Sequence, residues 1–345
     1  MKNIWILLIA MIILSSCNQK KSDSPEKKQE KKSEYTALQT KSKTFFGELP
    51  VVAENKNNPV TEEKVLLGKA LYFDTILSKN KTQSCNTCHN LDTYGVDNLP
   101  TSPGDAKGTL GTRNSPTVLN AALHIAQFWD GREPDVEAQA GGPVLNPVEM
   151  GMASEKEVVQ RLSNEEKYKQ MFAKAFPDDK EPITYENMKK AIGAFERKLI
   201  TPSKFDDFIK GDDSALTQTE KEGLQLFFDK GCTTCHSGNA LGGNIFQKFG
   251  IFADYWSLTK SKKIDEGKFE VTKNEGDKYI FKSPSLRNVA KTQPYFHDGS
   301  IANLNEAVKI MGKAQLNHDL TDQEVEKIVA FLNTLTGEIP AELKS

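Results

Sequence analysis

The residues with the most chemistry in this sequence lie in two short motifs, Cys85-Asn-Thr-Cys88-His89 and Cys232-Thr-Thr-Cys235-His236. Cys-x-x-Cys-His is the attachment pattern of c-type haem. The two thiols are one helical turn apart and can add to the two vinyl groups of a porphyrin, and the histidine can then ligate the iron. The motifs use four of the five cysteines and leave only Cys17. They therefore predict two covalently bound haem c groups.

Paired cysteines have three other common roles: a redox-active dithiol, a zinc site and a structural disulfide. A redox pair does not need the histidine that ends each motif, and no βαβ pattern surrounds either motif. A zinc ion takes four ligands, so one zinc site would have to combine two motifs that lie 147 residues apart. Haem attachment accounts best for both motifs.

The function of each haem depends on the second axial ligand of its iron. Met311 follows the second motif by 75 residues. Ligation by His and Met raises the reduction potential and blocks the iron against added ligands, which suits electron transfer. Spacing alone supports a ligand role and a packing role for Met311 equally. Met171 and Met188 lie on helical stripes, which favours a core role for both.

The region that follows the first motif contains Gln139 and Glu149 in a stretch rich in Gly and Pro. We expect a loop here that leaves one position of the first iron open and holds a carboxylate beside it. Peroxide cleavage needs such a group, because a proton must leave one oxygen and return to the other. The alternative for Glu149 is a solvated surface charge, and the residue pattern alone favours this alternative.

The N-terminus has the features of a secretion signal. The apolar run from Ile4 to Leu14 is too short to span a bilayer, which takes about 20 residues. It ends in Leu14-Ser-Ser-Cys17, a lipobox-like sequence, which predicts a signal peptide over residues 1–16 and a lipid on Cys17. Ordinary cleavage that leaves Cys17 as a free thiol is the alternative. Residues 17–44 are polar and rich in Lys, so we expect a disordered tether that attaches a periplasmic protein to a membrane.

The composition limits the partners. The formal net charge of −2 excludes a strongly basic nucleic-acid binder. A mean hydropathy of −0.53 is too low for a polytopic membrane protein. Residues 44–345 alone carry a net charge of −7, which would suit a basic protein partner.

Helical patterns dominate the chain and predict an all-α protein. Pairs of the type Ser/Thr-x-x-Glu, which cap helices, begin at Ser154, Thr217 and Thr321. Apolar residues at helical spacing follow the last of these pairs, whereas strand-like alternation is scarce. Residues 92–116 and 238–284 are rich in Gly, Pro, Asn and Ser and predict long irregular loops, which usually serve a site.

The chain contains an internal repeat. Four landmarks occur twice in the same order: a Gly-x-x-Leu-x-Phe-Asp segment, the Cys-x-x-Cys-His motif, a Ser-Pro segment that ends in Asn, and a Phe-x-Asp-Gly turn. They are residues 68–74, 85–89, 115–120 and 128–131 in the first copy, and residues 223–229, 232–236, 283–288 and 296–299 in the second. The repeat predicts two c-type cytochrome domains related by internal duplication, one over residues 45–205 and one over residues 206–345.

These features together resemble the bacterial dihaem cytochrome c peroxidases from about Val60 to Gly337. Besides the haem motifs, the shared segments are residues 95–98, 113–118, 127–132, 142–143, 148–150 and 294–299. The resemblance implies an enzyme that reduces hydrogen peroxide to water with electrons from a small cytochrome c or a cupredoxin. It also suggests a homodimer.

The resemblance implies a different role for each haem. The haem on His89 is similar to the low-potential peroxidatic centre, with Gln139 and Glu149 as its distal pair and Glu149 as general acid and base. The haem on His236, with Met311 as its second ligand, is similar to the high-potential centre that accepts electrons from the donor.

Two further features follow from the resemblance. Trp129 is similar to the tryptophan that relays electrons between the haems, and its partner in the repeat is His297. Asn114 and the backbone carbonyls of Thr292 and Pro294 match the ligands of a calcium ion, for which such oxygen atoms are suitable.

One position departs from the family. Many members carry a histidine 16 residues after the first haem histidine, where it caps the peroxidatic iron until the enzyme is reduced; this chain has Asp105 there. We therefore expect an open or water-bound iron in the oxidised enzyme. Of the two remaining histidines, His124 is better explained as a buried structural residue and His318 as a surface residue.

Two other functions compete with peroxide reduction. A related group of dihaem oxidases modifies tryptophans of a protein substrate, but these enzymes carry Tyr where Met311 stands. A dihaem electron carrier would have two six-coordinate irons and no use for Glu149.

Overall fold

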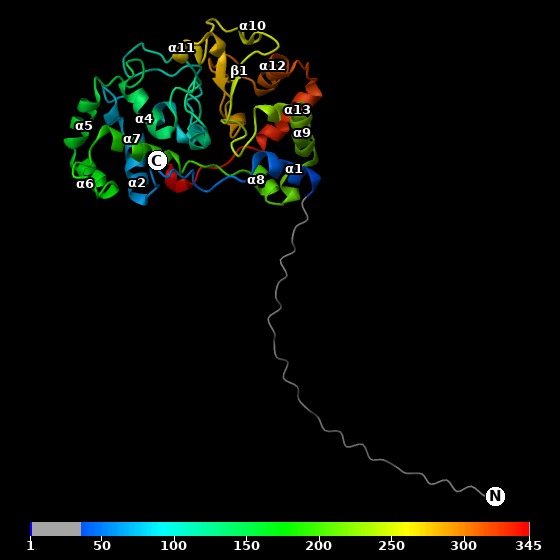
Figure 1. Cartoon of the computed structure of the whole chain (residues 1–345), viewed down its shortest axis with the longest axis horizontal. Helices are drawn as coiled ribbons and strands as arrows, with labels where there is room; N and C mark the ends of the chain where they lie inside the picture. Colours follow the sequence, from blue (N-terminus) through cyan, green and yellow to red (C-terminus); the bar gives the residue numbers. More distant parts are fainter. Residues whose placement is uncertain (2–35, 345) are drawn as a thin grey trace. The chain divides into compact units, whose positions relative to one another are not determined.

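The computed structural model describes Met1 and residues 36–344, so Cys17 and almost all of the expected signal peptide and tether lie outside the described residues. Helices form most of the regular structure, which confirms the all-α class (Figure 1). Within the described part of the chain, no helix combines the length and the apolar character that crossing a membrane requires. The helices of the first half are α2 (Glu62–Phe73), α3 (Cys85–Cys88), α4 (Val136–Leu145), α5 (Glu155–Ser163), α6 (Glu166–Ala175) and α7 (Tyr185–Glu196).

The second half contains helices and one small sheet. Its helices are α8 (Lys204–Ile209), α9 (Gln218–Asp229), α10 (Tyr255–Thr259), α11 (Phe269–Thr272), α12 (Leu304–Leu316) and α13 (Asp322–Asn333). Strands β1 (Phe246–Lys248) and β2 (Ile280–Lys282) pair antiparallel, with Phe246 opposite Lys282. The segment 238–284, expected to be irregular, thus contains short helices and strands between its turns.

Each expected capping residue begins a helix. Ser154 precedes α5, Thr217 precedes α9 and Thr321 precedes α13, and the side chain of each accepts a hydrogen bond from the backbone N–H of the glutamate three residues later. These bonds satisfy N–H groups that have no partner within the helix. The sequence pattern therefore located these three helix starts correctly.

Helix α1 (Ala37–Phe46) occupies residues that we expected to be disordered. A capping box between Thr36 and Gln39 begins the helix. The Gln39 side chain is buried and donates to the Phe208 carbonyl of α8 at 3.1 Å, and the Phe46 ring packs edge-on against Phe205. The prediction of a disordered tether is therefore wrong for residues 37–44, because a few buried contacts order a segment of polar composition.

The same helix pair occurs in both halves. Helix α2 packs against α7 in the first half, and α9 packs against α13 in the second. A glycine makes each crossing close: a Cβ atom on Gly68 would collide with the Ala191 carbonyl, and one on Gly223 would collide with the Lys327 carbonyl. These glycines begin the first repeated segment, so the structure supports the duplication inferred from the sequence.

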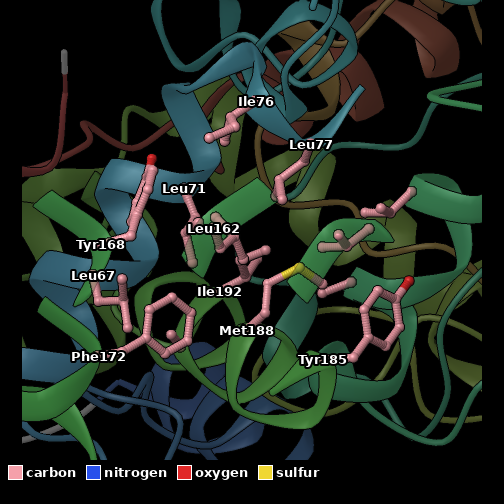
Figure 2. Packing of buried hydrophobic residues seen from close by; sticks show 14 of the residues in the cluster. Leu67, Leu71, Ile76, Leu77, Leu162, Tyr168, Phe172, Tyr185, Met188 and Ile192 are labelled. Carbon is pink, nitrogen blue, oxygen red and sulfur yellow. The ribbon is translucent and has the colours of Figure 1, made fainter. Parts of the chain in front are cut away.

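A hydrophobic cluster fills the first half between α2, α5, α6 and α7 (Figure 2). Met188 is fully buried in this cluster and Met171 packs against it, as their helical spacing predicts. The cluster includes Leu67, Leu71, Leu162, Tyr168, Phe172, Tyr185 and Ile192. This core holds α2, and through it the start of the first haem motif.

The two ends of the described chain pack on opposite halves. Helix α1 lies against α8 of the second half, whereas Ile339 and Leu343 join a cluster with Tyr72 and Phe195 of the first half. In Figure 1 the C-terminus accordingly lies beside α2 and α7. Each half therefore depends on a segment from the other end of the chain.

Candidate functional site

The first motif lies on the short helix α3, and His89 follows directly. The His89 N–H donates to the Cys85 carbonyl at 2.9 Å, and the Tyr72 hydroxyl donates to the His89 carbonyl at 2.5 Å. The His89 side chain is half-buried, and burial lowers the pKa of the imidazole, although the charge of Asp97 opposes this. A neutral imidazole is the form that ligates a metal ion.

The second motif lies at a cavity of about 260 Å³. Cys232, Cys235, His236 and Met311 all line this cavity, and most of the remaining lining is apolar. His236 Nδ1 lies 3.2 Å from the Leu241 carbonyl, and burial lowers the pKa of the ring to about 4. A hydrogen bond from one ring nitrogen to a carbonyl is the usual way in which proteins orient a metal-binding histidine. These residues fit a haem with His236 and Met311 on its iron.

The four motif cysteines form no disulfide with one another or with other described residues, and burial raises the pKa of each thiol. The pKa is about 12 for Cys85 and Cys232 and about 11 for Cys88. A redox-active dithiol requires a lowered pKa, because the thiolate is the reactive form. The environment of the motifs thus argues against a redox pair and is compatible with thioether attachment of haem.

The stretch that contains Gln139 differs from our expectation. We expected a loop, but residues 136–145 form α4, in which Asp135 caps the first turn. The Tyr185 hydroxyl donates to the Gly141 carbonyl at 2.6 Å, which fixes the helix at its Gly-Gly-Pro segment. Pro143 cannot donate to the Gln139 carbonyl, so the helix lacks one internal hydrogen bond there. Gln139 is half-buried in the second turn of α4.

Glu149 lies in the turn that follows α4, close to the first motif. Burial is the main cause that raises the pKa of the Cys88 thiol, and the negative charges of Asp97 and Glu149 add to it, whereas a hydrogen bond with Ser102 opposes the rise. Burial raises the pKa of Glu149 itself, while the positive charge of Arg132 and a 3.1 Å hydrogen bond from Asn146 oppose this rise. The residue is therefore no solvated surface charge. Its environment thus favours the protonated form more than water does, while Arg132 and Asn146 favour the carboxylate.

Trp129 lies at the junction of the two halves. Its indole N–H donates to the Asn114 carbonyl at 2.9 Å, and it lines the same cavity as His236. The Asn114 N–H in turn donates to the carbonyl of His297, the repeat partner of Trp129, at 2.7 Å. The rings of Trp129 and His297 lie edge to face, with their centroids 6.3 Å apart. Through Asn114, two hydrogen bonds thus join the repeated turns that contain Trp129 and His297.

The three residues expected to bind calcium also line this cavity. Asn114, Thr292 and Pro294 all lie on its wall. The Asn114 side-chain amide donates to the Leu99 carbonyl at 2.9 Å, which leaves the amide oxygen free to face a cation. The three residues thus lie on the wall of one cavity.

Asp105, which follows the first motif, stabilises the loop that precedes this motif. Its buried carboxylate accepts hydrogen bonds from the Asn80 N–H at 2.8 Å, from the Thr82 N–H at 3.2 Å and from the Thr82 hydroxyl at 2.6 Å. These bonds hold the pKa of the carboxyl below its usual range, although burial opposes them. With both oxygens occupied in this way, the carboxylate is directed toward residues 80–82.

The sequence analysis assigned no role to three residues near these sites. Arg132 stacks on the Phe128 ring at 3.4 Å and bonds to Asp130 at 3.0 Å, which places its charge near Glu149. Asn146 positions the Glu149 carboxylate, and Lys282 lies on the wall of the cavity at the second motif. Only the third could have been found, because the repeat pairs Lys282 with Asn114.

The two unassigned histidines lie apart from the first motif. His124 lines the cavity of the second motif, with Nδ1 3.4 Å from the Lys282 ammonium, and His318 is exposed on the surface. Neither side chain is described near His89.

Comparison with known proteins gives consistent matches over both halves. Residues 62–214 match the family described as Di-haem cytochrome c peroxidase, and residues 220–336 match the family described as Cytochrome c. The chain is 46% identical to the cytochrome c551 peroxidase of Pseudomonas aeruginosa, over 88% of this chain and 88% of that protein. It is 46% identical to the cytochrome c551 peroxidase of Nitrosomonas europaea, over 82% of each chain.

A solved structure is similar as well. A MauG-like protein associated with microbial copper homeostasis superposes with a TM-score of 0.75 at 31% identity, over 86% of this chain and 96% of that chain. The match extends over both halves of the fold described above.

Proposed function

The chain belongs to the di-haem cytochrome c peroxidase family, and we propose that its two haem sites divide the work of the enzyme. The protein is a cytochrome c peroxidase, which reduces hydrogen peroxide with electrons from a cytochrome donor. In our proposal the haem on His89 is the site of peroxide reduction, and the haem on His236 and Met311 receives the electrons. One observation carries this assignment: a half-buried carboxylate, Glu149, lies beside the first motif, whereas a thioether, Met311, lines the cavity of the second.

The residues around each iron would set its role. When bound, each haem supplies an iron that cycles between oxidation states at a potential set by its surroundings. Met311 would ligate the iron of a haem held by His236, and this ligation would raise the reduction potential and keep other ligands away. The Leu241 carbonyl holds the His236 ring in the orientation that ligation needs.

Glu149 acts as general base and then as general acid in this proposal. As a carboxylate it takes a proton from hydrogen peroxide, and as a carboxylic acid it returns this proton to the oxygen that leaves as water. Asn146 fixes one of its oxygens, and Arg132 keeps its pKa from rising too far for the base to ionise. Gln139 on α4 supplies an amide that orients the peroxide.

Trp129 connects the two sites in this proposal. Its ring lines the cavity of the second motif, and its indole N–H donates to the carbonyl of Asn114, in the segment that follows the first motif. An aromatic residue at this junction can relay single electrons. We also propose a calcium ion held by Asn114 and by the carbonyls of Thr292 and Pro294, since it would tie this segment to the second half.

The first iron is open to ligands in the oxidised enzyme, in our proposal. The carboxylate of Asp105 is engaged by the backbone and side chains of residues 80–82, so it is not free to cap the iron. The expected result is rapid cyanide binding by the fully oxidised protein, with a high-spin haem signal before cyanide is added. Slow binding and a purely low-spin spectrum would contradict it.

Further proposals concern the surroundings of the enzyme. The secretion signal supports a periplasmic location, with a lipid anchor on Cys17 beyond the described residues and residues 17–35 as its tether. The donor is a small cytochrome c or a cupredoxin, and the enzyme is a homodimer.

Oxidation of protein tryptophans is less well supported than peroxide reduction. The relatives named as peroxidases are 46% identical to this chain, whereas the MauG-like structure is 31% identical. A methionine at position 311, where the tryptophan-modifying enzymes carry a tyrosine, points in the same direction.

Stopped-flow spectroscopy tests the proposed division of work. The purified protein, fully oxidised in one series and half-reduced in another, is mixed with hydrogen peroxide while both haem spectra are followed. We expect peroxide turnover, with spectral changes first at the haem that lacks methionine ligation. A protein in which both haems stay six-coordinate and peroxide is not consumed would contradict the proposal.

A further inference from the structure

The cavity of the second motif has an unusual charge balance. Among the described residues that line it, Lys282 is the only Lys, Arg, Asp or Glu. The Lys282 side chain is nearly buried, with 7% of its surface exposed, and no carboxylate lies within ion-pair distance of its ammonium in the part of the chain that the structure describes. A buried ammonium without an anion is costly, so the cavity favours a ligand that carries a carboxylate.

His124 completes a polar pair on this wall. Its Nδ1 lies 3.4 Å from the Lys282 Nζ, and its Nε2 is buried without a hydrogen-bond partner in the described structure. If Nδ1 accepts from the ammonium, Nε2 carries the proton and can donate to a second oxygen. The pair thus offers two donors to one carboxylate. Burial lowers the pKa of Lys282 to about 8.

The internal repeat gives Lys282 a counterpart. Lys282 and Asn114 each precede the repeated Ser-Pro segment, and the backbone bonds match: the Lys282 N–H donates to the Trp129 carbonyl at 2.8 Å, and the Asn114 N–H donates to the His297 carbonyl at 2.7 Å. Thr292 and His124 also correspond in the repeat. Where the first half is proposed to hold a calcium ion, the second half therefore carries a cation of its own.

We infer that Lys282 and His124 form an anion site that holds a propionate carboxylate of the haem attached at Cys232 and Cys235. This assignment rests on the proposed function only in that it needs a haem at the second motif. The pair fixes the orientation of that haem and adds a positive charge near its iron. Because reduction lowers the charge on the iron by one, a nearby cation stabilises the reduced state and raises the reduction potential.

The test is a spectroelectrochemical titration of the haem-loaded protein at pH 7. We compare the wild type with Lys282→Met, with Lys282→Arg, which keeps the charge, and with Lys248→Met, an exposed lysine on the neighbouring strand. The expected result is a lower potential of the methionine-ligated haem in Lys282→Met, and potentials close to the wild type in Lys282→Arg and Lys248→Met. A Lys282→Met protein that loads haem with an unchanged potential would overturn the inference.

Loss of haem in a variant is also decisive. If Lys282→Met does not load the second haem and Lys282→Arg does, the need for a cation is supported. If neither loads haem, the lysine acts through its shape and the inference is wrong.

A second series distinguishes a haem propionate from a free anion. We expect added acetate to change the potential of the second haem in the wild type by no more than it changes this potential in Lys248→Met. An acetate-dependent shift that disappears in Lys282→Met would show that the site binds free carboxylates, against our assignment. None of these measurements uses peroxide, so an absence of peroxide turnover would count against the proposed function alone.

Discussion

At the scale of single residues, the environment of Glu149 decides between a peroxidase and an electron carrier. We predict that Glu149→Gln lowers kcat for peroxide reduction by about 100-fold or more, since an amide cannot transfer the proton. Steady-state turnover with a reduced cytochrome donor measures this effect. Glu155→Gln, which changes an exposed glutamate on α5, is the matched control and should retain full activity. Equal activity of the wild type and Glu149→Gln would favour another acid–base group.

The pH dependence of turnover gives an independent check on Glu149. The base must be ionised, so activity falls as the pH drops through its pKa. Burial raises the pKa of Glu149, and the fall should therefore begin at a higher pH than for an exposed glutamate. In Arg132→Met the opposing positive charge is lost, and we predict that the acid limb of kcat/KM moves upward by up to about one pH unit. A limb that stays in place, or one that moves to lower pH, would show that another group controls it.

Single residues were predictable where the chemistry has a fixed spacing. The Cys-x-x-Cys-His motifs define two haem sites from five adjacent positions, and their environment in the structure is compatible with this role. Glu149 could not be separated from a surface glutamate, because its burial depends on α4 and on Arg132 rather than on neighbouring sequence. Lys282 pairs with Asn114 in the repeat, but its burial beside the cavity of the second motif depends on tertiary structure, so the sequence alone did not show its role.

At the scale of elements, the helix crossings at Gly68 and Gly223 hold the two haem motifs in equivalent places. Each helix, α2 or α9, ends shortly before its motif, and each is pressed against a partner helix at its glycine. A methyl group at either glycine would meet a backbone carbonyl that cannot move without its helix. The repeat therefore conserves a packing contact as well as a cofactor motif.

We predict that Gly68→Ala and Gly223→Ala each lower the free energy of unfolding by about 1–3 kcal/mol, the usual cost of overpacking a core. Denaturant titration followed by circular dichroism measures the change. Gly276→Ala is the control, because this glycine is exposed and a Cβ atom there would meet only ordinary contacts. If the two core variants were as stable as the control, the close crossings would not be a constraint on the fold.

Elements were predictable where caps and apolar spacing agree, as at Ser154, Thr217 and Thr321. They were missed where composition and tertiary contact disagree. Helix α4 contains Gly141, Gly142 and Pro143, which favour a loop, yet a cap at Asp135 and the bond from Tyr185 stabilise it. Helix α1 is polar, and it is ordered through residues of α8 more than 150 positions away, which no local pattern can indicate.

At the scale of the whole molecule, the chain crosses between its halves at both ends. Helix α1 covers the second half, and the segment with Ile339 and Leu343 covers the first half beside Tyr72. Tyr72 donates to the His89 carbonyl, so the C-terminal segment packs directly behind the residue that supports the first haem histidine. The halves are thus linked by more than the peptide that joins them, and the first site depends on the last residues of the chain.

This crossing predicts which site fails first when the C-terminal segment is weakened. Leu343→Ala removes buried surface next to Tyr72 and should destabilise the first half by about 2–5 kcal/mol, the usual cost of truncating a buried leucine. Thermal unfolding followed at both haem spectra should show the haem on His89 losing its native iron ligation at a lower temperature than in the wild type, while the spectrum of the methionine-ligated haem is affected less. Val271→Ala, at an exposed apolar position on α11 of the second half, is the control and should leave both transitions in place. An earlier loss of methionine ligation at the second haem in Leu343→Ala would mean that the C-terminal segment supports its own half instead.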